Sequence, residues 1–181
     1  MTACTPPAAF QPNFAAGTSD EAFSRFTLAV PHDARFRLAL GWFGLGIAAL
    51  AASGILAVLL VLSRTPVLAD LFPVANCFHT ALVAHVDLSV LVWFVAFAGG
   101  LWSLNSTPRL LRLGWIALAC AGAGSAMIAL APFGGGTPIM SNYVPVIDSP
   151  TFLGGLAVLG VGMTCLVARG LFASPLVGIR L

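Results

Sequence analysis

Four long apolar stretches run through the sequence, and short segments rich in proline, glycine and polar residues separate them. Each stretch has roughly the 20 helical residues needed to cross a hydrocarbon layer of about 30 Å. We expect transmembrane helices over residues 38–62, 77–104, 111–131 and 152–168. The segments between them contain residues that end helices: Arg64-Thr65-Pro66, Asn105-Ser106-Thr107-Pro108, and the loop from Gly134 to Pro150.

This pattern predicts an all-α, polytopic membrane protein with four transmembrane helices. We expect a tail over residues 1–34, a four-helix domain over residues 35–173 and a short tail over residues 174–181. The first 30 residues lack the basic start, short apolar run and cleavage site of a signal peptide, so we interpret them as part of a loosely ordered tail. The loop from Gly134 to Pro150, which contains Asn142, Tyr143 and Asp148, is interpreted as an ordinary turn-rich connection.

The composition supports a membrane protein. Of the 181 residues, 59% are hydrophobic and 8% are charged, and the mean hydropathy is +1.00. A soluble core of this size could not bury so much apolar surface. The net charge of +2 is too small and too scattered to indicate a nucleic-acid partner. Four widely spaced cysteines form no C-x-x-C pair, so we interpret them as small packing residues.

The arginines predict the orientation, because positively charged loops stay on the cytoplasmic side of a membrane. With four crossings, seven of the eight arginines lie on one side and Arg64 lies on the other. Both termini are therefore predicted to be cytoplasmic. Small residues in the third stretch, Gly122 and Gly124 among them, are typical of membrane helices that pack closely.

The second stretch contains polar residues where lipid would be expected. The segment FHTALVAHVDLSVLVWF, residues 78–94, includes His79, His85 and Asp87. An aspartate at the centre of a membrane helix costs about 2.5–3.5 kcal/mol on insertion scales, so its presence indicates a function. At about 100° per residue, His85 and Asp87 lie about 200° apart around a regular helix. We therefore expect protein on both sides of this helix, as part of a larger helical bundle.

His85 is the candidate ligand of a heme iron. Ala81, Ser89 and Trp93 lie on the same face of a regular helix, and small neighbours let a flat macrocycle approach closely. The alternative is a histidine that is hydrogen-bonded to a neighbouring helix, and the residues leave both interpretations open. Asp87 is interpreted as a hydrogen-bonding anchor, with membership of a proton path as the alternative.

The other two histidines do not complete a site with His85. His79 lies about 240° away around a regular helix and near the interface, so we interpret it as partly hydrated. His32 lies at the opposite membrane face. A six-coordinate heme would need its second histidine from outside this sequence.

Two segments resemble the catalytic subunit of heme-copper oxidases. The segment LVAHVDLSVLVWFVAFAGGLWSL, residues 82–104, resembles the second transmembrane helix of that family, where an Ala-His or similar pair precedes a long apolar run. The segment HDARFRLALGWFGLG, residues 32–46, is similar to the family's opening helix. The resemblance implies that His85 is one of two axial ligands of a low-spin heme, of type b or a, that receives electrons from cytochrome c or a quinol. It also implies the bacterial cytoplasmic membrane or the mitochondrial inner membrane.

The sequence departs from that family in what it lacks. The family's second low-spin ligand, high-spin heme ligand and three copper-binding histidines lie on later helices. The resemblance therefore implies a split or partial subunit of a terminal oxidase or nitric-oxide-reductase-like complex, not catalytically complete alone. A partner chain would carry the high-spin heme and copper, alongside other oxidase subunits. Two alternatives are a small cytochrome b-type anchor of a quinone-linked dehydrogenase and a non-redox structural subunit.

Overall fold

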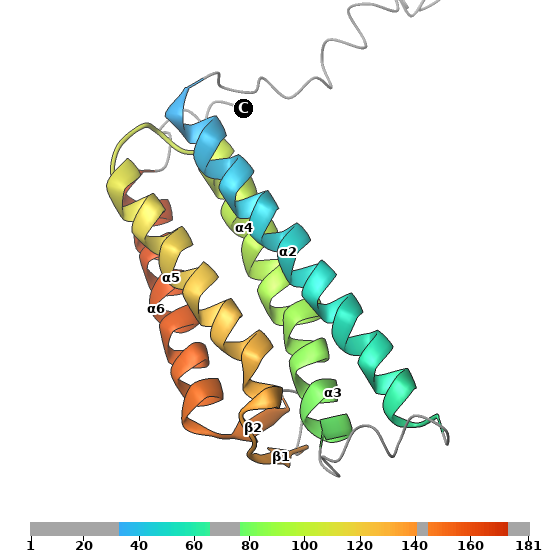
Figure 1. Ribbon diagram of the computed structural model, residues 1–181. Helices are drawn as coiled ribbons and strands as arrows, with labels where there is room; N and C mark the ends of the chain where they lie inside the picture. Colours follow the sequence, from blue (N-terminus) through green and yellow to red (C-terminus); the bar gives the residue numbers. More distant parts are fainter. Residues whose placement is uncertain (1–32, 66–76, 141–144, 174–181) are drawn as a thin grey trace, which may run out of the picture. The chain divides into compact units, whose positions relative to one another are not determined.

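The computed structural model describes residues 33–65, 77–140 and 145–173 (Figure 1). Nearly all of the expected N-terminal tail and the whole of the expected C-terminal tail lie outside the described residues. The same holds for His32, Asn142 and Tyr143.

All four expected helices are confirmed, and each boundary lies within four residues of the expected one. The first crossing is α2, Ala34–Ser63. The second is continuous but composite, with α3 Cys77–Asp87, the π-helical turn η2 Leu88–Val92 and α4 Trp93–Leu104. The third and fourth are α5 Leu111–Leu130 and α6 Pro150–Phe172. Four helices are thus long and apolar enough to cross a membrane, which makes the chain an integral membrane protein.

Polar side chains start two of these helices. The carboxylate of Asp33 accepts a hydrogen bond from the backbone nitrogen of Arg35 at 2.8 Å, and so caps α2. The hydroxyl of Ser149 accepts from the backbone nitrogen of Phe152 at 3.2 Å and caps α6, where Pro150 occupies the first turn. Partial desolvation raises the pKa of Asp33, but the hydrogen bonds from Arg35 and its positive charge outweigh this and hold the pKa below its ordinary 3.8.

Glycines let the helices approach each other closely. In Figure 1, α5 runs beside α6, and α2 runs beside α3 and α4. On α5, a Cβ added at Gly124 would lie 2.6 Å from the carbonyl oxygen of Gly155 on α6. The side chain of Trp42 on α2 is fully buried and covers Gly99 on α4, where an added Cβ would lie 2.4 Å from the indole. The contact at Gly124 brings two helix backbones together, as in other membrane bundles, whereas Gly99 leaves room for a large side chain.

The loop between α5 and α6 is more ordered than a plain connection. After the 3₁₀ turn η3 Ala131–Phe133, strands β1 Thr137–Ile139 and β2 Val146–Asp148 form an antiparallel pair that contacts α3. Ile147 of β2 is fully buried. The hairpin therefore covers the end of the bundle at which the second crossing begins (Figure 1).

Candidate functional site

Two hydrogen-bonding groups of Ser53 hold the side chain of His85. The Nδ1 atom of His85, in α3, lies 2.8 Å from the hydroxyl oxygen and 2.9 Å from the carbonyl oxygen of Ser53, in α2. The Ser53 hydroxyl donates to the backbone carbonyl of His85 at 3.0 Å. A carbonyl oxygen can only accept, so this geometry assigns the proton of a neutral imidazole to Nδ1. Ser53 is 2% exposed, which places this contact in the packed helix interface.

The second ring nitrogen of His85 is left with a free lone pair. Within the described part of the chain, Nε2 has no hydrogen-bond partner. This atom is also not completely buried. The side chain is only partly buried by the four helices. Metal-binding histidines commonly show this arrangement, in which one ring nitrogen donates to a carbonyl and the other binds the metal.

The candidate ligands of this chain fit one axial position of a heme iron better than a metal site with several protein ligands. Across residues 33–65, 77–140 and 145–173, no group of three or more histidine, cysteine, aspartate or glutamate side chains could hold a metal ion. One imidazole with a free Nε2 matches one axial position of a heme iron.

The three residues expected beside the heme lie in different surroundings. Ala81 is 2% exposed and packs inside the four-helix unit. The Ser89 hydroxyl donates to the backbone carbonyls of His85 at 2.8 Å and Val86 at 3.2 Å, so it stays on its own helix. Trp93 stacks on Phe97, with 5.4 Å between ring centroids and 9° between planes. Their role beside a heme stays a prediction.

The π turn changes the geometry that the sequence suggested for Trp93. We expected a regular helix, in which Trp93 lies two turns after His85 on one face. The turn Leu88–Val92 lies between them, and hydrogen bonding from i to i+5 fits an extra residue into the turn and rotates everything that follows. The assumption of a regular helix was therefore wrong over residues 88–92. Such π turns occur often at functional sites.

Asp87 is buried, and one of its two carboxylate oxygens is unpaired among the described residues. The residue is 2% exposed, and in the described part of the chain its Oδ2 atom has no hydrogen-bond donor. The interpretation of Asp87 as an anchor to a neighbouring helix thus has no support at this oxygen. His79 is exposed near the start of α3, and its ring lies edge-on to Phe78 at 5.3 Å.

A second polar site, which sequence reasoning missed, lies at the other end of the bundle. Arg169 of α6 is 1% exposed, and its Nη2 donates to the Ser106 hydroxyl at 2.7 Å. An Nη1 atom of Arg35 donates to the backbone carbonyl of the same serine. The sequence offered one indication, an arginine only just beyond the expected end of the last apolar stretch, but we used it only to assign orientation.

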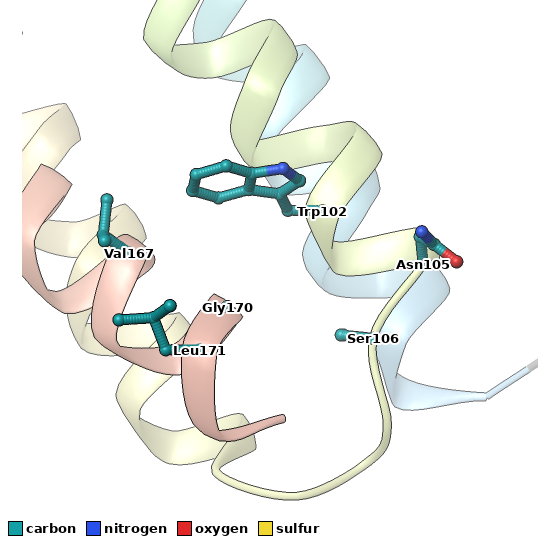
Figure 2. A pocket seen from close by; sticks show the side chains of 6 residues that line it. All are labelled: Trp102, Asn105, Ser106, Val167, Gly170 and Leu171. Carbon is teal, nitrogen blue, oxygen red and sulfur yellow. The ribbon is translucent and has the colours of Figure 1, made fainter. Parts of the chain in front are cut away.

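A pocket of about 270 Å³ opens beside this serine (Figure 2). Figure 2 shows the Trp102 ring reaching from α4 toward the side of α6 that bears Val167 and Leu171. The lining residues come from the end of α4, the following loop and the end of α6: Trp102, Asn105, Ser106, Val167, Gly170 and Leu171.

Two known proteins match the chain. One is an uncharacterized protein of Rickettsia prowazekii (strain Madrid E), 28% identical over 148 residues that cover 68% of this chain and 29% of that protein. The other is an uncharacterized protein of Aquifex aeolicus (strain VF5), 37% identical over 131 residues that cover 67% of this chain and 31% of that protein. The chain thus spans between 29% and 31% of the length of these relatives. No family model and no solved structure matches it.

Proposed function

We propose that this chain supplies His85 as one axial ligand of a low-spin heme in a heme-copper-oxidase-like membrane complex. The observation that carries the proposal is the state of the imidazole. Its Nδ1 is held by Ser53, while Nε2 has no partner among the described residues. An unpaired ring nitrogen inside a membrane would be costly unless another group covers it.

Ser53 would act as the residue that positions the ligand. A hydrogen bond from Nδ1 to a carbonyl sets the tautomer and ring orientation and makes Nε2 a more basic ligand. A low-spin heme with two imidazole ligands would carry single electrons and stay closed to oxygen. The hydroxyls of Ser53 and Ser89 donate to the backbone carbonyl of His85 at 3.0 and 2.8 Å. These two bonds would hold the helix in place next to the π turn.

The remaining parts of the assembly would lie outside the described residues. We propose that a partner chain or further helices carry the second axial ligand, the high-spin heme and the copper. The length of the relatives supports this, since more than two thirds of each lies beyond the matched region. The donor would be cytochrome c or a quinol, and the acceptor oxygen or nitric oxide.

The proposed membrane is the bacterial cytoplasmic or mitochondrial inner membrane. The end of the bundle that bears most of the arginines would face the cytoplasmic side. The contacts of Ser106 with Arg35 and Arg169 support the arrangement, because they bring three distant segments to one end of the bundle. Arg64 follows the other end of α2.

One observation favours a non-redox structural subunit as the second candidate. The hydrogen bonds between His85 and Ser53 join α2 and α3 directly, and such interhelical bonds stabilise a membrane bundle by about 0.6 kcal/mol each. This role accounts for Nδ1 but leaves Nε2 without a function.

The test is the heme spectrum of the intact complex purified from its native membrane. His85→Gly should abolish the low-spin signal in optical and electron paramagnetic resonance spectra, and added imidazole should restore it by occupying the vacated position. His79→Gly, on the same helix but exposed, is the matched control and should leave the spectrum unchanged. A low-spin signal that survives in His85→Gly would refute the proposal. A wild-type complex without any heme would favour the structural role.

A further inference from the structure

The pocket in Figure 2 continues as a groove along α6. A second depression of about 450 Å³ is lined by six residues of that helix: Gly160, Met163, Thr164, Val167, Ala168 and Leu171. Val167 and Leu171 also line the first pocket, so the two join. At 1.5 Å per residue, the stretch from Gly160 to Leu171 is about 16 Å long. We call the combined feature the α6 groove.

The two ends of the α6 groove differ in chemistry. The mouth, at the end of α4, is polar because the amide of Asn105 is exposed there. Ser106 is 4% exposed, and its hydroxyl donates to the Ser103 carbonyl at 3.0 Å. The side chain of Asn105 makes no hydrogen bond with any described residue. Trp102 stands at the same level and is 45% exposed, as is typical of tryptophan at a membrane interface. The rest of the groove is lined almost entirely by apolar groups.

Unbalanced positive charge lies directly behind the mouth. The guanidinium of Arg169 contacts only the Ser106 hydroxyl and, at 3.5 Å, the Thr107 carbonyl, and no described carboxylate pairs with it. The described carboxylate at this end, Asp33, lies 2.8 Å from Arg35 and is therefore occupied. Three more arginines at this end are exposed: Arg37, Arg109 and Arg112.

We propose that the α6 groove binds an anionic phospholipid, with its phosphate at the amide of Asn105 and one acyl chain along α6 toward Gly160. A ligand that complements the whole groove must be negative at one end and hydrocarbon over about 16 Å. Basic pockets between membrane helices bind anionic headgroups in this way. The positive charge of Arg169, whose guanidinium lies 2.7 Å from the Ser106 oxygen behind the mouth, attracts the phosphate electrostatically. This site is independent of the heme proposed at His85.

The experiment measures lipid binding to the purified full chain in neutral detergent. Thermal unfolding and native mass spectrometry are recorded with phosphatidylglycerol, with phosphatidylcholine and with inorganic phosphate. Phosphatidylglycerol should raise the unfolding temperature and remain bound, whereas phosphatidylcholine should bind at least about fivefold more weakly, since one basic residue near a membrane surface contributes about that factor. Equal stabilisation by inorganic phosphate would show a free-anion site and overturn the proposal, as would equal binding of the two lipids.

Two pairs of variants locate the site. Asn105→Asp places a negative charge at the mouth and should weaken phosphatidylglycerol binding by about fivefold relative to Asn105→Ser, which removes the amide without adding charge. Trp102→Ala should also weaken binding, whereas Trp115→Ala should not, because Trp115 is equally exposed at 46% but lies outside the groove. If both members of each pair bind like the wild type, or both lose the lipid equally, the α6 groove is not the site.

Discussion

Replacing Gly124 with alanine gives a sharp test of how α5 and α6 pack. An added Cβ at Gly124 would lie 2.6 Å from the carbonyl oxygen of Gly155 and 2.6 Å from the backbone nitrogen of Leu159. Both atoms belong to the backbone of α6 and cannot rotate away, so the two helices would have to separate. At Gly122, two residues earlier on the same helix, an added Cβ meets nothing within 4 Å.

The matched pair separates packing from helix propensity. In a helix interior, glycine to alanine is favourable by about 0.8–1.0 kcal/mol, and this contribution is common to Gly124→Ala and Gly122→Ala. Forcing an extra methyl group into a tightly packed contact costs about 1–3 kcal/mol. The free energy of unfolding of Gly124→Ala should therefore lie about 1–3 kcal/mol below that of Gly122→Ala.

Both variants can be unfolded reversibly in mixed micelles by titration with sodium dodecyl sulfate, followed by tryptophan fluorescence and circular dichroism. The wild type should lie between them or close to Gly122→Ala. If the Gly124 and Gly122 variants unfold at the same detergent fraction, the close contact of α5 with α6 is not as the structure has it.

Three further predictions use the same unfolding measurement or its pH dependence. A double-mutant cycle of Ser53→Ala and His85→Ala should give a coupling energy of about 0.6 kcal/mol, and additive effects would contradict the contact between the Ser53 hydroxyl and Nδ1 of His85. Gly99→Ala should likewise be about 1–3 kcal/mol less stable than Gly122→Ala, because its Cβ would lie 2.4 Å from the buried indole; equal stability of the two variants would argue against that contact. Because the pKa of Asp33 is lowered, its pairing with Arg35 stabilises the fold above pH 3.8, and this stabilisation is lost as the pH falls through the lowered pKa. Asp33→Asn should therefore make the free energy of unfolding depend less on pH in the acidic range. An unchanged pH dependence would refute this.

The sequence by itself determined the number and extent of the helices. In lipid every backbone polar group needs an internal partner, so an apolar stretch of about 20 residues has little choice but to form a helix. Polar residues with proline or glycine then end it, as at residues 64–66 and 105–108. The same reasoning singled out His85 and Asp87, because a polar side chain within an apolar stretch is conspicuous without any structure.

The tertiary structure alone decided which faces meet. Outward-facing and inward-facing positions of a membrane helix are both apolar, so hydrophobic periodicity does not indicate the packed side. The sequence could not distinguish Gly124, which touches α6, from Gly122, which faces open space. Nor could it pair Ser53 with His85, since these residues are 32 positions apart and only the packing of α2 on α3 joins them. The burial of Arg169 against Ser106, 63 positions away, likewise follows from how the ends of α4 and α6 come together.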